Sequence, residues 1–336
     1  MISFILIHIF INILLNYYNK TIARFYNLFD FPDSNRKLHK YQTPLLGGLF
    51  FIISLSFIFV FLLFEKFTEG NLKFLFDNYL IFFLISYLFY FLGYFDDKYH
   101  LNANTKLFCM IGLILISLIF DKNLLLTDLR ISFYPNSLSF GNYSYPLTIL
   151  CFLLFINAFN MLDGLNGQAM TYAIFIFLIF IFNGVMKQLV IPLVISSLFF
   201  LYLNLKNKTF LGDSGSLTLG FILSSIFLKT YNLDNNFYSD EIFLIMCIPG
   251  YELLRLAIKR ILNKKHAFSA DNNHIHHLVI SNCNFTKTYF IIQALLIAPY
   301  ITYLISKSFY ISFIFSLVFY SLLINYFSKK NEKKNS

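Results

Sequence analysis

Apolar segments long enough to cross a bilayer recur from one end of the chain to the other, separated by short polar stretches. Hydrophobic residues make up 58% of the 336 residues and charged residues only 13%, whereas about 25% charged residues is usual for a soluble domain. Because a lipid-exposed segment must satisfy its backbone hydrogen bonds internally, these segments are expected to be helices. The sequence therefore predicts an all-α polytopic integral membrane protein with about eleven transmembrane helices. The predicted spans are 2–18, 45–64, 79–95, 106–120, 146–162, 169–186, 189–204, 217–229, 241–262, 285–305 and 309–328.

The distribution of Lys and Arg among the connecting segments predicts the orientation of the chain. If the first span ends in the cytoplasm, the segments on that side carry more than twice as many Lys and Arg residues as the opposite ones. Because basic residues accumulate in cytoplasmic loops, we predict an outer N-terminus and a cytoplasmic C-terminus. Residues 1–328 then form one transmembrane domain, 329–336 a basic cytoplasmic tail, and 121–145 an external loop or hairpin. Membrane orientation explains the net charge of +9 better than nucleic-acid binding, for which no motif is present.

The apolar run that begins at Tyr79 ends in two adjacent carboxylates, Asp96 and Asp97. The C-terminal end of a helix carries partial negative charge, so paired carboxylates there are disfavoured without a nearby cation. Lys98 and Lys106 supply part of that positive charge, and a divalent metal ion would supply more. We favour a functional site here over the alternative of a solvated helix boundary.

A second polar constellation, NAFNMLDGLNG at 157–167, closes the fifth predicted span. Asn157, Asn160 and Asp163 recur near helical spacing and are expected to face one side. Amides within a span are costly without partners, which suggests function, although helix packing followed by a turn is the alternative. The two glycines of this segment permit a tight turn and a close approach of the backbone to a ligand.

The segment LGDSGS, residues 211–216, shares its GDSG with serine proteases of the trypsin type. Those enzymes are soluble β-barrels whose serine works with a buried His and Asp, whereas this segment lies between two predicted spans. A Gly-Asp-Ser-Gly turn that opens a helix instead offers backbone amides to a phosphate and a carboxylate to a metal ion. We therefore predict that Asp213 lies in a phosphate- and metal-binding turn.

Three histidines, His274, His276 and His277, fall within the segment DNNHIHH. Tight histidine clusters usually indicate zinc, but no cysteine lies near and the preceding segment is strongly basic. Imidazoles beside lysines suit anionic oxygens at least as well. Binding of a phosphate or sugar phosphate is therefore favoured over zinc and over a solvated loop.

Arg36 and His39 lie in DSNRKLHKYQTPLLGG, residues 33–48, together with two lysines and two glycines. Alone, this segment is equally well explained as a basic cytoplasmic loop. All five polar motifs, however, fall on the predicted cytoplasmic side. One shared site at the inner membrane surface is the economical interpretation, which favours an anion-facing role for Arg36 and His39.

The order and spelling of these motifs resemble the polyprenyl-phosphate N-acetylhexosamine-1-phosphate transferases, the family of WecA, TagO and MraY. The resemblance covers about residues 30–280 and rests on PDSNRKLH followed by P..GG, GYFDD followed by Lys106, NAFNMLDG, LGDSGS and HIHH. HIHH is more similar to the WecA branch than to MraY, whose loop typically reads HHH. One departure is Asn166 in DGLNG, where many bacterial members have a second Asp; an amide can still bond uracil as donor and acceptor.

The resemblance implies an enzyme that transfers an N-acetylhexosamine 1-phosphate, GlcNAc 1-phosphate or a close epimer or deoxy analogue, from a UDP-sugar to undecaprenyl phosphate. UMP is released, Mg²⁺ is the expected cofactor with Mn²⁺ as an alternative, and the product initiates a cell-envelope polysaccharide. The resemblance also implies a multi-pass protein of the bacterial inner (plasma) membrane with its active site on the cytoplasmic face, and is compatible with a homodimer. Its partners would be the UDP-N-acetylhexosamine, undecaprenyl phosphate and membrane lipid, with no nucleic acid.

Two other functions stay open at this point. A phospho-MurNAc-pentapeptide transferase of peptidoglycan synthesis is the alternative within the same family. An ion-coupled secondary transporter is the alternative from another class, but transporters place ionisable residues near the membrane midplane within repeated halves. Here the polar motifs stand at helix ends, and no internal repeat is present.

The resemblance also assigns roles to residues, and these roles fit the physical demands of the reaction. Two anionic substrates must approach each other, so cations and in-line positioning are expected to do most of the work. Which carboxylate of the Asp96–Asp97 pair acts as a base stays open. The implied catalytic residues are Asp96, Asp97, Lys106 and Asp163; the implied substrate-binding residues are Asn157, Asn166, Arg36, His39, His274, His276 and His277; the implied metal ligands are Asp213 and Asn160.

Overall fold

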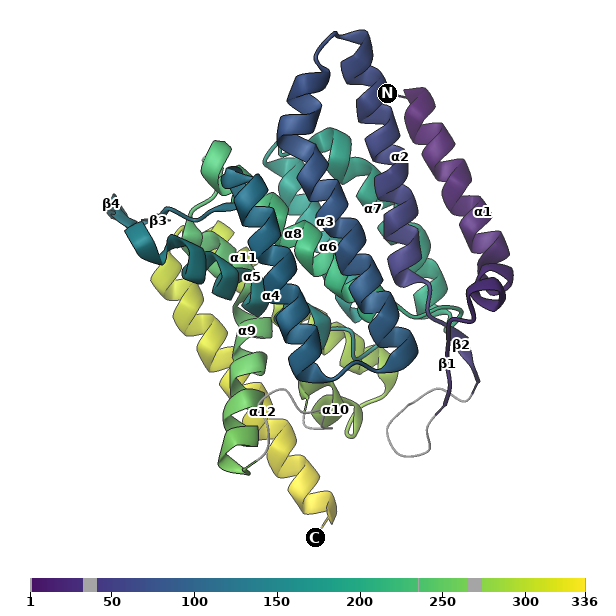
Figure 1. Cartoon of the computed structure of the whole chain (residues 1–336). Helices are drawn as coiled ribbons and strands as arrows, with labels where there is room; N and C mark the ends of the chain where they lie inside the picture. Colours follow the sequence, from purple (N-terminus) through teal and green to yellow (C-terminus); the bar gives the residue numbers. More distant parts are fainter. Residues whose placement is uncertain (1, 33–40, 235, 265–273, 336) are drawn as a thin grey trace.

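The computed structural model describes residues 2–32, 41–234, 236–264 and 274–335, and it is a bundle of helices (Figure 1). A helix overlaps each of the eleven predicted spans, which confirms the all-α polytopic class. The basic segment after residue 328 continues the last helix. The helices are α1 (Ile2–Tyr26), α2 (Gly47–Thr68), α3 (Leu72–Tyr99), α4 (Ala103–Phe120), α5 (Ser144–Met161), α6 (Gln168–Phe182), α7 (Lys187–Leu205), α8 (Gly212–Leu233), α9 (Ser239–Leu262), α10 (Ile275–Ile280), α11 (Phe285–Ser306) and α12 (Phe309–Asn335).

Within the described ranges, eight helices are long and apolar enough to cross a membrane: α1, α2, most of α3, α4, α5, α7, α11 and most of α12. Helix α6 is apolar but shorter. Helices α8 and α9 have 22 and 24 residues but a more polar composition. The number of spans and the sides on which the termini lie remain predictions.

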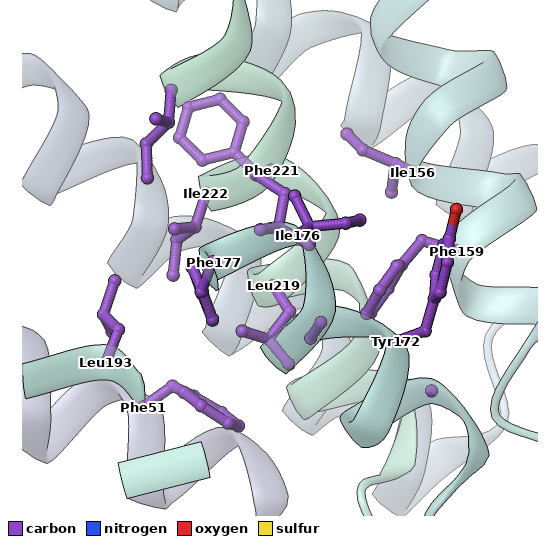
Figure 2. Packing of buried hydrophobic residues seen from close by; sticks show 14 of the residues in the cluster. Phe51, Ile156, Phe159, Tyr172, Ile176, Phe177, Leu193, Leu219, Phe221 and Ile222 are labelled. Carbon is purple, nitrogen blue, oxygen red and sulfur yellow. The ribbon is translucent and has the colours of Figure 1, made fainter. Parts of the chain in front are cut away.

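Helix α8 lies at the centre of the bundle and packs mainly against α3, α5 and α2. Small residues allow this close packing: a Cβ on Gly220 would lie 3.1 Å from Ile156 Cα of α5. The hydroxyls of α8 bond to its own backbone, as Thr218 Oγ1 does to Ser214 O at 2.6 Å. Small and hydroxyl residues of this kind suit the interior of a membrane bundle. Figure 2 shows Leu219, Phe221 and Ile222 of α8 packed among side chains of neighbouring helices.

Two short antiparallel ribbons flank the bundle: β1 (Phe29–Asp30) with β2 (Thr43–Pro44), and β3 (Asp128–Ile131) with β4 (Tyr134–Ser139). The second ribbon confirms the hairpin predicted within 121–145. It is attached to the C-terminal end of α8, where Tyr231 Oη donates to Asp128 O at 3.1 Å. At 1.5 Å per residue, the 22-residue α8 is about 33 Å long, and it separates this hairpin from the GDSG motif at its other end.

Candidate active site

The turn between α3 and α4 brings Lys106 back onto the carboxylate pair. His100 ends α3 with a left-handed backbone (φ 52°), so the chain reverses direction there. Lys106 Nζ lies 2.6 Å from Asp96 Oδ2 and 2.7 Å from Asp213 Oδ1. The prediction that Lys106 supplies the compensating charge is therefore confirmed. Lys98, the other expected cation, lies instead over the ring of Tyr94, 5.7 Å from its centroid.

Asp97 caps the N-terminus of α8. Its Oδ1 accepts from Asp213 N at 2.7 Å and its Oδ2 from Ser214 N at 3.0 Å. Gly212, with φ +69°, leaves room for this carboxylate, since a Cβ there would lie 2.7 Å from Asp97 Oδ2. The positive end of the helix dipole thus compensates the second aspartate. Asp97 binds these two amides in the structure, and phosphate binding by this turn stays a prediction.

Asn160 joins the end of α5 to the carboxylate of Asp213. Its Nδ2 donates to Asp213 Oδ1 at 2.5 Å and to Ser216 Oγ at 2.8 Å. Asn157, one turn earlier, donates to Leu153 O of its own helix at 2.8 Å. The structure therefore brings Asn160 into contact with Asp213, whereas the substrate-binding role of Asn157 stays a prediction.

Asp163 follows α5 and lies among the acidic residues. Burial raises the pKa of its carboxyl well above the usual range, and the negative charges of Asp213 and Asp97 raise it further. A hydrogen bond from the Gly212 backbone acts in the opposite direction. Asp163 thus holds its proton more readily than an ordinary aspartate does.

The histidine cluster lies against the turn that follows Asp163. The buried ring of His276 rests on the backbone of Gly164, where any added Cβ would collide with the ring. The rings of His274 and His277 lie 5.3 and 4.3 Å from that of His276, centroid to centroid. Burial, with the neighbouring histidines, lowers the pKa of His276 well below its ordinary value. His276 is therefore a neutral imidazole at neutral pH.

Asn166 is bonded to a residue that the sequence analysis missed, Asn207, whose Oδ1 accepts from Asn166 Nδ2. Asn207 lies in the loop between α7 and α8 with φ 55°. At the end of α7, just before this loop, Asn204 Oδ1 accepts from Gly167 N at 2.5 Å, and Asn204 Nδ2 donates to Thr209 O at 2.8 Å. The loop thus holds the turn that carries Asn166. The signal that could have identified it is the amide-rich stretch NLKNKT just before LGDSGS.

Arg36 and His39 lie in 33–40, outside the described residues, so their roles stay predictions. The chain that follows this segment is nevertheless placed near the site. Phe210 N donates to Pro44 O at 2.8 Å, and Gly47 N donates to Phe210 O at 3.2 Å. The chain that follows 33–40 is therefore hydrogen-bonded to the residue just before LGDSGS.

The donor atoms around Asp213 fit a magnesium ion that is shared with a substrate. Its Oδ1 accepts from Lys106 and Asn160, and the side chain keeps 34% of its surface exposed. Because the nitrogen of Asn160 donates, its oxygen is the atom that could coordinate. Mg²⁺ commonly uses one or two carboxylates together with water and substrate phosphate. In the described part of the chain, no group of three His, Cys, Asp or Glu residues is placed to hold a metal alone.

Comparison with known proteins points to one family. Residues 79–231 match the family model described as glycosyl transferase family 4. A probable undecaprenyl-phosphate N-acetylglucosaminyl 1-phosphate transferase of Bacillus subtilis (strain 168) is 30% identical over 256 residues, which are 74% of this chain and 68% of the relative. An undecaprenyl-phosphate α-N-acetylglucosaminyl 1-phosphate transferase of Escherichia coli (strain K12) is 26% identical over 277 residues, 79% of this chain and 72% of the relative.

Proposed function

Because this chain belongs to glycosyl transferase family 4, we propose that it transfers GlcNAc 1-phosphate from UDP-GlcNAc to undecaprenyl phosphate and releases UMP. Both relatives described above carry the lipid acceptor and the GlcNAc 1-phosphate group in their names. Their similarity extends over about three quarters of this chain. The chain is a multi-pass membrane transferase, as its apolar helices and family membership require.

The observation that carries this proposal is the meeting of Asp96, Lys106 and Asp213 at the N-terminal end of α8. These residues come from three helices, and one ammonium group lies within 2.7 Å of both carboxylates. A structural ion pair needs one carboxylate. A second carboxylate whose side chain is partly exposed suits a site that receives additional positive charge and phosphate oxygens.

The reaction we propose joins two anions. An oxygen of the lipid phosphate attacks the phosphorus that carries the sugar, the bond from that phosphorus to the bridging oxygen breaks, and UMP leaves with this oxygen. Lys106 offsets the negative charge that gathers around Asp96 and Asp213. We assign Asp213 and the Asn160 oxygen to Mg²⁺, with Mn²⁺ as an alternative. The ion, when bound, supplies charge neutralisation at the diphosphate.

The two carboxylates at the end of α3 then have separate tasks. Asp97 fixes the N-terminus of α8, and with it Asp213, through two backbone hydrogen bonds. Asp96 keeps one oxygen on Lys106 and the other on Leu101 N, 2.9 Å away. Either residue remains a candidate for a base toward the lipid phosphate. Asp163 is a third candidate for holding a proton within the site.

We place the active site on the cytoplasmic face of the bacterial inner membrane. The nucleotide sugar is a cytosolic solute and the polyprenyl acceptor lies in the bilayer, so the reaction requires a site at the inner surface. The described site residues stand at helix ends or in adjoining loops. The predominance of Lys and Arg in the segments on that side supports the same placement.

The test is the reaction itself. Purified protein is given undecaprenyl phosphate with UDP-GlcNAc, other UDP-N-acetylhexosamines or UDP-MurNAc-pentapeptide, and UMP and lipid-linked sugar are measured with and without Mg²⁺. We expect Mg²⁺-dependent turnover of UDP-GlcNAc. Turnover of the pentapeptide substrate alone would favour the peptidoglycan transferase, and no UMP with any donor would overturn the proposal.

Two substitutions probe the site in the same assay. Asp213→Asn and Asp97→Asn are expected to lower turnover about 10²–10³-fold, the usual effect of removing one electrostatic contact to a transition state. Asp77→Asn is the matched control, because Asp77 is an exposed carboxylate of α3. Turnover near that of the unsubstituted protein in both site variants would remove this site assignment.

A further inference from the structure

Helix α10, which carries His276 and His277, has only six residues, Ile275–Ile280. A helix this short is not stable by itself, because the few hydrogen bonds it forms do not offset the cost of nucleation. Its position must therefore be fixed by contacts with the rest of the bundle. Those contacts decide where the histidines stand.

One buried carboxylate holds the beginning of this helix. Glu252 of α9 is 5% exposed, and its Oε1 accepts from Ile275 N at 2.7 Å. Ile275 N belongs to the first turn of α10, where backbone amides have no partner within the helix. Leaving such a buried amide without a partner is destabilising. Glu252 therefore determines where the backbone next to His276 lies.

Glu252 is itself fixed by two other side chains. Arg255 donates to both of its oxygens, from Nη2 at 2.8 Å and from Nε at 3.0 Å. Tyr320 of α12 donates to Oε2 at 2.6 Å. A carboxylate held by a bidentate guanidinium and a phenol has little freedom to move. The position of α10 is thereby coupled to α9 and to the last helix.

The close packing around His276 leaves α10 little room to shift. Its ring rests on the Gly164 backbone, where not even a methyl group would fit. Beyond the other end of α10, Asn331 Oδ1 of α12 accepts from Ser281 Oγ at 2.8 Å and from Asn282 Nδ2 at 2.5 Å. A shift of Ile275 would therefore move His276 relative to the turn that carries Asp163.

We propose that Glu252 is the positioning residue of the histidine cluster, acting through Ile275 N to hold His276 against Gly164 at the substrate site. Glu252 and its partner Tyr320 lie outside the 79–231 region that matches the family model. This inference rests on the proposed function for its kinetic readout. Its structural readout does not depend on that function.

The kinetic test compares Glu252→Ala and Glu252→Gln with the unsubstituted protein. Misplacing a group in an active site by about 1 Å can cost about 10²-fold, so we expect Glu252→Ala to lower kcat/KM by about that factor. Glu252→Gln keeps an oxygen for Ile275 N and is expected to recover most of the activity. Tyr251→Phe is the matched control: it removes a hydrogen bond between the same two helices, Tyr251 Oη to Ser316 Oγ at 3.1 Å, without touching α10.

A double-mutant cycle separates positioning from general stabilisation. If Glu252 acts through His276, adding Glu252→Ala to a His276→Ala protein should change kcat/KM less than about twofold, since residues that act as a unit are not additive. Full additivity would overturn the proposal. So would normal kcat/KM in Glu252→Ala, or failure of Glu252→Gln to recover activity when it unfolds at the normal temperature.

Hydrogen–deuterium exchange supplies the readout that is independent of turnover. Amides of 275–280 should exchange at least about tenfold faster in Glu252→Ala than in Tyr251→Phe, and unchanged exchange there would contradict the proposal. If Glu252→Ala does not fold, Ile275→Pro decides. It deletes the same N–H at a helix position that proline tolerates, and Ile275→Ala controls for the lost side chain. If the unsubstituted protein is inactive, the proposed function is contradicted. If it is active and the Glu252 and Ile275 variants behave like it, only this inference is contradicted.

Discussion

Asp213 is held by contacts of three kinds. Its backbone amide donates to Asp97, its Oδ1 accepts from Asn160, and the same oxygen receives the ammonium group of Lys106. One oxygen is thus saturated, while the partly exposed side chain can still bind a cation. Rigid positioning of a carboxylate that keeps binding capacity is the arrangement expected of a preorganised site.

The contact between Asn166 and Asn207 leads to a prediction about substrate affinity. If the Asn166 amide recognises the base of the nucleotide, Asn207→Ala should loosen it and raise KM for UDP-GlcNAc about 3–10-fold, the worth of one neutral hydrogen bond. The value of kcat should stay the same, because the contact lies away from the reacting phosphorus. Steady-state kinetics measure both constants. Lys208→Ala, on the same exposed loop, is the control, and an equal rise in KM there would contradict this prediction.

The buried neutral state of His276 leads to a prediction about pH. Its pKa is lowered in the folded protein, whereas a histidine in the unfolded chain has a pKa of about 6.5. The unfolded state therefore binds a proton first as the pH falls, so the stabilisation present above about 6.5 is lost at lower pH. His276→Gln cannot take up this proton. Between pH 7.5 and pH 5 the unfolding temperature should fall less in the variant than in the unsubstituted protein. An equal fall in the two proteins would refute the prediction.

Contacts between residues that are close along the chain could be predicted from the sequence, whereas most contacts between distant residues could not. Asp96 and Lys106 flank one turn, so charge compensation at a helix end predicted their pairing. The partner of Asp97 lies 116 residues away, and no local rule indicates which helix N-terminus a carboxylate will cap. Asn207 and Glu252 were missed for the same reason, because each is recognisable only once two distant loops or helices have been brought together.

At the scale of the elements, hydrophobicity predicted the existence of the helices but placed several of their ends poorly. Helix α8 begins at Gly212, five residues before the predicted span, because its polar first turn is satisfied by Asp97 and by its own backbone. Helix α3 begins at Leu72, seven residues before its predicted span. Apolar composition indicates where lipid is tolerated, whereas hydrogen bonds and caps determine where a helix ends.

The crossing of α3 and α8 depends on one glycine. A Cβ on Gly93 would collide with the backbone of Asp213 and Ser214, so Gly93→Ala should push the two helices apart. We expect a loss of about 1–3 kcal/mol, the usual cost of overpacking, and a large fall in turnover because Asp97 and Asp213 would separate. Thermal unfolding and the UMP assay measure the two effects. Gly112→Ala in α4, where a Cβ meets nothing within 4 Å, should lose neither stability nor turnover.

At the scale of the whole molecule, α8 separates the candidate active site at its N-terminus from the β3–β4 hairpin at its C-terminus. The ion-pair cluster and the histidines stand toward its N-terminus, where the α3–α4 turn and α10 lie in Figure 1. The β3–β4 hairpin is attached at its C-terminus through Tyr231. Since α8 is about as long as the hydrocarbon core is thick, these two ends should face opposite sides of the membrane.

This arrangement predicts the accessibility of single cysteines placed at the two ends. In a protein whose four native cysteines have been replaced, Asn136→Cys at the exposed hairpin should react with a membrane-impermeant maleimide in intact cells. Lys98→Cys, exposed at the end of α3, should react only after the membrane is permeabilised. The proposed donor is a cytosolic nucleotide sugar, so the opposite pattern would put the carboxylate cluster out of its reach. Labelling of both positions in intact cells would mean that α8 does not span the bilayer.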